Sequence, residues 1–336
     1  MRAGERGSAS LSALLGLCIV ALAGASAAIL LGAVGRAAQR SDARSARRSE
    51  LELIAREAVS RLALDPTPDA DCARDPVWSW ARLDRTDGAE VRISDLSSAL
   101  DANWVQKSLL LRTGMSELLS PGGADELQQR RVSSGFSADI GGAYGDLFGV
   151  GALERYFTGY GYANVNTTDE FALRELYRMR TGDADGAELF HRRIQEALES
   201  GRIFDPRDLP ALFGEAYPQL FPVMNAEPAL NVHFLDPGLL LKLLSHPAWH
   251  VPDPAGVAEK IEERRESVEL TAAELGRIIG APEESRLHQY LGVVTWFWLV
   301  SVSRRGERIE LVVARLPSAS GGPSPRLLVV EERYSK

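Results

Sequence analysis

Side chains that could bind a metal or catalyse a reaction are sparse in this chain of 336 residues. His246 and His250 stand four residues apart, as the histidines of a zinc protease helix do, but Pro247 interrupts the helix and no glutamate follows the first histidine. No Gly-x-Ser-x-Gly element, phosphate-binding glycine loop or Cys-x-x-Cys pair occurs in the sequence. We therefore predict no catalytic residues and a protein that is not an enzyme.

Acidic residues in loops are the remaining candidates for a metal site. Asp183-Ala-Asp185-Gly186 resembles part of a calcium loop but lacks the other ligands and the terminal glutamate. We favour the solvated start of a helix at this place. Calcium is the one cofactor left open, with its ligands unknown.

Two asparagine-containing strings form the sharpest local pattern. Asn164-Val165-Asn166 and Asn231-Val232-His233 lie 67 residues apart. Asparagine tolerates left-handed backbone and bonds to neighbouring amides, which suits a turn that leads into a helix. We interpret Asn164, Asn166 and Asn231 as structural turn motifs, with contacts to a partner as the alternative.

These strings open a longer internal repeat. Leu176 and Ile194 match Leu243 and Ile261 at the same offset. Each unit is expected to hold a turn, two helices and a short third helix, and short periods of this kind are typical of stacked helical units. The units span about 164–214 and 231–280, and a degenerate third unit spans 103–149.

The first helix of each repeat has an expected start. Asp169 and Asp236 are predicted N-caps, because an aspartate side chain accepts bonds from the first free amides of a helix. Pro237 then falls at the first helical position, where its missing N–H costs nothing.

Strand patterns flank this helical region on both sides. Before it, Val77–Leu83 and Ala89–Ile93 are rich in β-formers and are joined by the turn Thr86-Asp87-Gly88. After it, three runs predict strands: Val293–Val302, Ile309–Leu316 and Arg326–Arg333. The predicted fold class is α+β, with one small antiparallel sheet into which a helical domain is inserted.

The amino-terminal segment is apolar enough for a bilayer. Ser8–Gly35 holds no charged residue and would make a helix of roughly 42 Å, against a hydrocarbon core of about 30 Å. The helical pattern continues through Leu51, Ala55 and Leu62 until Asp65-Pro66-Thr67-Pro68 ends it. We expect this long helix to pack on the sheet with its second half.

Three interpretations of the apolar segment compete. A signal peptide would be cut near Ala25-Ser26-Ala27, a plain signal anchor would stay intact, and a prepilin-type leader would be cut after Gly7 so that Ser8 becomes the first residue. Arginines follow the segment as well as precede it, so that the positive-inside rule, counted alone, would leave the large domain in the cytoplasm.

The net charge of −8 argues against nucleic acid as a partner.

The chain resembles the minor pseudopilin K family of type II secretion systems, also called general secretion pathway protein K. The resemblance rests on Arg6-Gly7-Ser8-Ala9 before an apolar helix, on Ile93–Asn103, on Ala163-Asn-Val-Asn166-Thr167 and on an aromatic strand before an arginine-bearing hairpin. Thr168 replaces the alanine common in that string. The resemblance implies a pilin-like sheet, with an inserted domain of two SAM-like repeats.

The same resemblance implies how the chain is processed and assembled. Prepilin peptidase would cut after Gly7, and Ser12 would stand at the fifth mature position, where most pseudopilins have glutamate but this family does not. In a filament, that glutamate can neutralise the amino terminus of the preceding subunit. A subunit at the filament tip has no subunit ahead of it and does not need the glutamate. The implied partners are the major pseudopilin, the other minor pseudopilins, the inner membrane and, beyond these, a secreted substrate or the outer-membrane secretin.

These patterns divide the chain into segments. Residues 1–7 are the leader, 8–64 the helix, 65–100 and 287–336 the two parts of the sheet, and 101–286 the inserted domain. The expected function is to cap the tip of the pseudopilus, from a single-pass position in the bacterial inner membrane with the domain in the periplasm. The alternative is a periplasmic binding or scaffold protein exported by a cleaved signal peptide.

Overall fold

The computed structural model of the chain describes residues 33–34, 38–65, 67, 69–82, 88–112, 114–282, 285–317 and 326–335. The predicted processing residues Gly7 and Ser8 lie outside the described residues, as does most of the apolar segment. The chain divides into two compact units, Met1–Ile54 and Ala55–Lys336.

The described residues of the first unit are helical. They cover 33–34 and 38–54, and most of their side chains are exposed, including that of Leu53. Within the described parts of the chain, no helix is long and apolar enough to cross a membrane.

The second unit opens with helical residues 55–63, which bury Ala55, Ala58 and Leu62. The helix ends just before Asp65, as the proline pattern predicts. The Asp65 carboxylate then accepts a bond from the Thr67 amide, with 3.0 Å between N and Oδ1.

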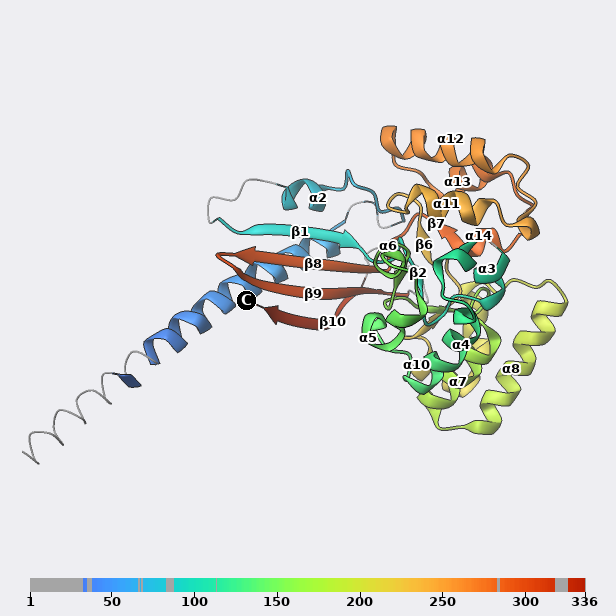
Figure 1. Ribbon diagram of the computed structural model, residues 1–336, viewed down its shortest axis with the longest axis horizontal. Helices are drawn as coiled ribbons and strands as arrows, with labels where there is room; N and C mark the ends of the chain where they lie inside the picture. Colours follow the sequence, from blue (N-terminus) through green and yellow to red (C-terminus); the bar gives the residue numbers. More distant parts are fainter. Residues whose placement is uncertain are drawn as a thin grey trace, which may run out of the picture. The chain divides into compact units, whose positions relative to one another are not determined.

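A four-stranded antiparallel sheet joins strands from both ends of the second unit (Figure 1). Its order is β1 (Glu90–Asp95), β8 (Phe297–Arg304), β9 (Glu307–Leu316) and β10 (Arg326–Ser335). Between β8 and β9, Arg305 and Gly306 both have positive φ, which matches the twist of a tight hairpin. The prediction of a mixed α and β protein with an antiparallel sheet is confirmed.

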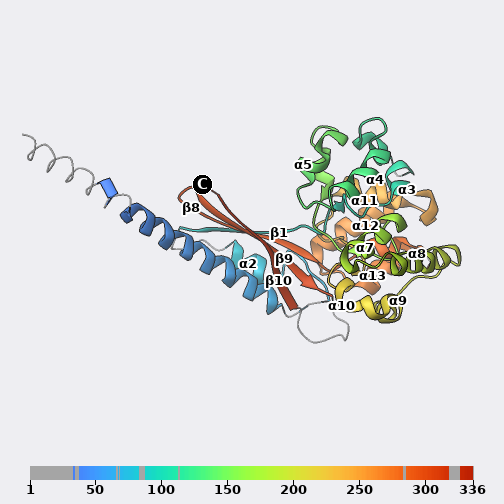
Figure 2. The same cartoon turned by 90° about the horizontal axis from the view of Figure 1, so that it is seen from below.

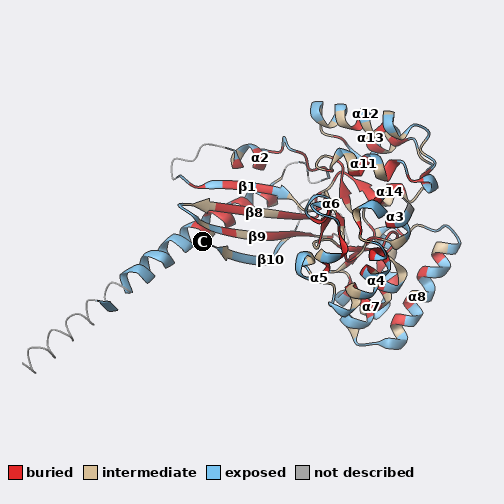
Figure 3. Cartoon of the chain, in the orientation of Figure 1, coloured by how far each residue is buried: buried red, intermediate tan, exposed pale blue. Residues whose placement is uncertain are grey.

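The two faces of the sheet bury different residues. On one face Val300 lies opposite Ile93 and Leu311, and Figures 1 and 2 show helical residues 55–63 running along the sheet. On the other face an aromatic cluster forms around Phe297 and Tyr162. β8 and β9 are the central strands and are buried on both faces, whereas the edge strand β10 is largely exposed (Figure 3).

The predicted strand over Val77–Leu83 is wrong, because Pro76–Ala81 forms helix α2. Pro76 occupies the first turn, where its fixed φ favours a helix. Alternating aromatic residues in so short a run do not distinguish a buried strand from a buried helical turn. β1 therefore pairs with β8 and not with residues 77–81. The start of the predicted strand Val293–Val302 is also wrong, since β8 begins at Phe297.

Between β1 and β8 the chain forms three modules with one plan: an opening two-residue strand, a set of short helices, and a closing two-residue strand that pairs in parallel with the opening one. The opening and closing pairs are β2 (Leu100–Asp101) with β3 (Phe157–Thr158), β4 (Ala163–Asn164) with β5 (Met224–Asn225), and β6 (Leu230–Asn231) with β7 (Leu291–Gly292). We call residues 100–158, 163–225 and 230–292 the first, second and third modules.

Each module holds five or six helices among the described residues. The first has α3 (Lys107–Arg112), η1 (Met115–Leu118), α4 (Gly123–Ser133), α5 (Ile140–Tyr144), η2 (Gly145–Leu147) and α6 (Ala152–Tyr156). The second has α7 (Glu170–Thr181), α8 (Ala184–Glu199), η3 (Pro206–Asp208), α9 (Leu209–Phe213), η4 (Gly214–Ala216) and α10 (Tyr217–Leu220). The third has α11 (Pro237–Leu244), η5 (Pro247–Trp249), α12 (Pro254–Ser267), α13 (Ala272–Ile279) and α14 (Leu287–Tyr290).

The predicted caps of the first helices are confirmed. Asp169 accepts bonds from two amides at the start of α7, and Asp236 does the same for α11, with Pro237 at its first position. Each cap thus satisfies amides that have no partner within the helix.

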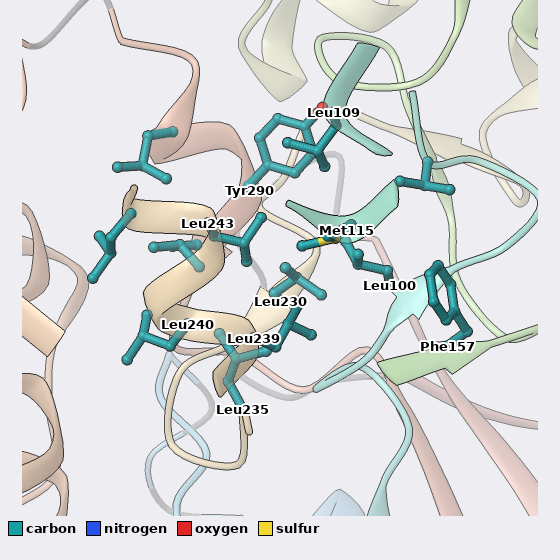
Figure 4. Close-up of a cluster of buried hydrophobic side chains, with 14 of the residues drawn as sticks. Leu100, Leu109, Met115, Phe157, Leu230, Leu235, Leu239, Leu240, Leu243 and Tyr290 are labelled. Carbon is teal, nitrogen blue, oxygen red and sulfur yellow. The ribbon is translucent and has the colours of Figure 1, made fainter. Parts of the chain in front are cut away.

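The modules do not pack in sequence order. Residues of the first and third modules share one apolar core, in which Leu100, Met115 and Phe157 lie with Leu230 and Leu239 (Figure 4). The second module has a core of its own, built around Leu173, Phe190 and Leu209. Trp104 and Phe136 of the first module pack against this second core.

Candidate functional site

The opening turns of the three modules share one hydrogen bond. The side-chain oxygen of the first turn residue accepts from the amide two residues later: Asp101 from Asn103 at 2.7 Å, Asn164 from Asn166 at 2.8 Å and Asn231 from His233 at 3.0 Å. This is the Asx turn that aspartate and asparagine favour. The first module therefore has the same opening as the two units that the sequence makes visible.

The third turn residue ties the opening to a later part of its module. The Asn166 amide group bonds to both the N–H and the C=O of Phe204, at 2.8 and 2.9 Å. His233 Nε2 lies 3.1 Å from the amide of Leu270, which donates to it. Both residues thus satisfy buried backbone before the third helix, although one is an amide and the other an imidazole. Burial lowers the pKa of His233, which keeps the ring neutral for this role.

Asn164 and Asn166 also hold the second module to the third. Asn164 Nδ2 donates to Glu227 O at 2.6 Å and to Gln289 O at 3.3 Å, and Asn166 Nδ2 donates to the Gln289 side chain at 3.0 Å. Tyr290 adds a bond from its hydroxyl to Thr167 O at 3.2 Å. The first predicted turn motif is therefore a junction between modules.

Asn231 makes the equivalent junction with the base of the sheet. Its Nδ2 donates to Asp71 O and to Thr295 Oγ1, both at 2.9 Å, and its side chain is fully buried. Asp71 lies between the N-terminal helix and α2, and Thr295 immediately precedes β8. One amide thus connects the third module to both chain segments that enter the sheet.

A buried ion pair lies beside Asn231. Arg315 of β9 and Asp71 are 6% and 4% exposed, with 2.8 Å between Nη2 and Oδ1. The other Asp71 oxygen accepts from Thr295 N at 2.7 Å. Burial raises the pKa of Asp71 to about 7, against the opposing effect of Arg315. Two oppositely charged groups removed from water in this way fix geometry more than they add stability.

A small cavity lies where the three modules meet. It has a volume of about 50 Å³ and is lined by polar groups of each module, among them Asp101, Asn164, Asn225 and Tyr290. Within the described residues, Asp101 Oδ2 and Asn225 Oδ1 are buried without a hydrogen-bond partner. A cavity of this volume is large enough for ordered water, which could bond to these two oxygens.

A larger groove separates the sheet from the helical region. It has a volume of about 580 Å³, with Phe136, Tyr160 and Met179 on one side and Leu328 and Val330 of β10 on the other. Its lining is mostly apolar, and within the described residues it does not include Asn164, Asn166 or Asn231.

Several acidic residues in the loops of the modules serve as helix caps. Asp183 accepts from Gly186 N at 2.9 Å at the start of α8, so it marks the beginning of a helix, as expected. Asp205 and Asp208 form a capping box before α9, and Asp139 caps α5. Asp146 pairs with Arg130.

Two groups of metal-ligand types gather in a region that the sequence did not single out. They are Cys72, Asp75 and Glu269, and Asp65, Asp71 and Asp75, with ligand atoms within 4.8 Å of one another in each group. Most of their atoms have partners within the chain: Asp75 accepts from the Cys72 amide at 2.9 Å, and Asp71 pairs with Arg315. These bonds account for the geometry, and we assign no ion to it.

The paired histidines lie in a structural turn. His246 accepts from Ala248 N at 3.1 Å and stacks near Trp249, while His250 ends the short helix η5 with a φ of 53°. The i, i+4 spacing therefore does not lie on a regular helix.

No family model matches this chain, and no curated protein matches it.

The residues that connect the modules to one another and to the sheet fall into two classes. Asn164, Asn166 and Asn231 belong to a visible sequence pattern. Asp71, Thr295 and Arg315 lie far apart in the sequence, and only their burial as polar residues among apolar ones signals a role.

Proposed function

We propose that this chain is a minor pseudopilin that caps the tip of a type II secretion pseudopilus. The observation that carries the proposal is the pairing of β1 with β8 across the three modules, which follows helical residues 55–63. A helix, one small antiparallel sheet and a large insertion between its strands are the arrangement that the sequence resemblance implies. The proposal includes a periplasmic position for the sheet and the modules.

The insertion gives the proposed position a steric reason. The modules occupy about 200 residues between β1 and β8, more than the sheet itself holds. A filament subunit must accept another subunit above it, and a bulky insertion at the free end of the sheet would block this. The tip is the one position where nothing has to stack on the modules.

Exposed apolar side chains on the N-terminal helix support packing against other subunits. Val34 and Leu53 are 61% and 71% exposed. In the proposed filament these side chains would be buried against the helices of neighbouring pseudopilins, which an isolated chain lacks.

The mature N-terminus tests the proposal. We expect mass spectrometry of the protein from its native membranes to find Ser8 as the first residue, because prepilin peptidase would cut after Gly7. A start near Ala28 would remove the filament helix and favour an exported binding or scaffold protein, and an intact Met1 would indicate a plain anchor.

A second experiment tests the steric argument. We expect a variant in which a short linker replaces Ala102–Arg286 to be found along the pseudopilus as well as at its tip, by immunogold labelling. The full-length chain is the control. A variant still confined to the tip would show that the modules do not determine the position.

A further inference from the structure

One of the three opening turns has an acid where the others have an amide. Asn164 and Asn231 use Nδ2 to hold the segment that follows a closing strand, through Glu227 O and Thr295 Oγ1. Asp101 occupies the same position and makes the same turn bond through Oδ1. Its Oδ2 has no hydrogen-bond partner among the described residues, and it is buried.

The segment that follows the closing strand of the first module lies against this oxygen. A Cβ added to Gly161 would come within 2.7 Å of Asp101 Oδ2, so the backbone there approaches the carboxyl group closely. Trp104 Nε1 fixes the same segment by donating to Gly161 O at 2.9 Å. Residues 159–161 are thus the counterpart of the segments held by Asn164 and Asn231.

The groups around Asp101 do not supply a donor to Oδ2. Arg131 of α4 faces it, but its Nη1 donates to Val105 O at 3.1 Å, and its Nε and Nη2 have no partner among the described residues. Tyr144 of α5 donates to Asn103 at 2.7 Å. Tyr160, Tyr162 and Tyr290 are the other titratable groups that line the cavity where the three modules meet. Burial raises the pKa of Asp101 to about 7, and Arg131 opposes this shift.

We propose that Asp101 is a proton-controlled latch: its protonated carboxyl group donates from Oδ2 to the chain segment 159–161, as the two asparagines donate from Nδ2, and loss of the proton to solvent releases this segment. The protonated acid has the donor and acceptor pattern of asparagine, whereas the carboxylate has acceptors only. The inference does not depend on the proposed function.

Release of the segment would reach the edge of the sheet. Tyr160 lies within the segment, donates from its hydroxyl to Glu331 of β10 and accepts from Arg333 Nη2 at 2.8 Å. Gly159, Tyr160 and Gly161 also line the groove of about 580 Å³. The latch therefore couples pH to the width of the groove and to the connection between the first module and β10.

Hydrogen exchange of the full chain in detergent micelles tests the latch. The measured quantity is the protection of the amides of 159–162 against exchange, corrected for the intrinsic exchange rate. In the wild type this protection should fall by up to about tenfold for each pH unit between about 4 and 7, because the open state binds fewer protons than the closed state. In Asp101→Asn the protection should be independent of pH and equal to that of the wild type below about pH 4, where Asp101 is protonated in both the closed and the open state. Amides of α8 are the internal control, and we expect no such slope there.

The reciprocal variant keeps the proposal testable if Asp101→Asn folds poorly. Asn164→Asp should introduce a pH-dependent protection in residues 226–229 that the wild type lacks. A flat wild-type profile at 159–162, or the same slope in Asp101→Asn as in the wild type, would overturn the latch. If Asp101→Asn were less protected than the wild type by the same factor at every pH, the latch would be overturned too. That result would show that Asp101 is an ionised carboxylate stabilised by Arg131.

Discussion

At the scale of single residues, different side chains satisfy equivalent buried backbone groups. Asn166 and His233 both satisfy the backbone that precedes a third helix, at 2.8 and 3.1 Å. An orphaned amide at such a place would cost about 1–3 kcal/mol, and this cost explains why neither position holds an apolar residue. The turn motif is thus defined by bonding capacity and not by residue type.

The equivalence of these positions makes a prediction for His233. His233→Ala should lower the free energy of unfolding by about 1–3 kcal/mol, because Leu270 N loses its acceptor. His233→Asn should remain within about 1 kcal/mol of the wild type. Urea unfolding of the full chain in detergent measures both, and equal losses in the two variants would contradict the equivalence.

The pH dependence of these variants follows from the lowered pKa of His233. The neutral ring contributes stability that is present above the unfolded pKa of about 6.5 and is lost as pH falls through the folded pKa. His233→Asn should remove this acid-side loss. The comparison of the two unfolding curves between pH 7.5 and pH 5 checks it.

The buried pair of Arg315 and Asp71 predicts the opposite pH dependence, because here stability is lost as pH rises. Arg315→Met should cost about 3–5 kcal/mol at pH 8, because it leaves a buried charge without its partner. The folded pKa of Asp71 is already raised, so its contribution is present below the unfolded value and is lost as pH rises through about 7. The loss in Arg315→Met should therefore shrink near pH 5, where Asp71 is neutral.

An exposed arginine gives the matched control for this variant. Arg48 pairs with Glu52 at 2.7 Å on the surface of the N-terminal helix. Arg48→Met should change the free energy of unfolding by less than about 1 kcal/mol at either pH, as exposed pairs do. Similar effects of the two substitutions would mean that the Arg315 pair is not sequestered from water.

At the scale of elements, the caps decide where helices begin. Asp236 accepts from two amides of α11 and also pairs with Arg155 of α6 at 3.0 Å. The two interactions have different chemical requirements, since a cap needs an acceptor oxygen and the pair needs a charge. Substitutions can therefore separate them.

We predict that Asp236→Ala costs about 1 kcal/mol and Asp236→Asn much less, because asparagine caps a helix nearly as well as aspartate. Thermal unfolding followed by circular dichroism measures the difference. Asp169→Ala and Asp169→Asn repeat the test in the second module, where the cap accepts from two amides in the same way. If the Asn and Ala variants of Asp236 were equally destabilised, the exposed ion pair would matter more than the cap.

The element that the sequence misassigned is short and aromatic. The sequence of residues 77–81 is compatible with a strand and with a helical turn, because the run is too short for its hydrophobic periodicity to distinguish them. Packing decided the outcome: Trp78 is buried, 7% exposed, and its ring lies 5.0 Å from that of Phe234. A contact between residues so far apart in sequence has no local signal.

At the scale of the whole molecule, the modules have cores of their own. The first and third share one apolar cluster and the second has another, and neither cluster includes a strand of the four-stranded sheet. The contacts with the sheet and its entering segments include the bond of Asn231 to Asp71, the aromatic cluster around Tyr162, and the bonds of Tyr160 to β10. The modules thus resemble a domain with a small attachment that is partly polar and partly aromatic.

We predict that residues 99–294, expressed alone, fold cooperatively. Burial of both apolar cores supplies the driving force, and about 200 residues are enough for a stable domain. Urea unfolding should give one transition, with the far-ultraviolet circular dichroism of a helical protein. A fragment that binds a hydrophobic dye and unfolds without a transition would show that the modules need the sheet.

The sequence by itself determined those parts that depend on neighbours along the chain. The sequence predicted the helix caps at Asp169 and Asp236, the end of the helix before Asp65, and the repeat opened by Asn164 and Asn231, because each depends on backbone and side chains only a few residues apart. The alternation of strand residues likewise predicted the sheet at both ends.

Only the tertiary structure decided what lies together across the chain. It made Pro76–Ala81 a helix, gave the faint first repeat the same plan as the others, and packed the first module on the third. It also joined Asp71 to Arg315, 244 residues apart. Such contacts follow from which buried surfaces fit one another, and the spacing of residues along a single chain carries no record of that fit.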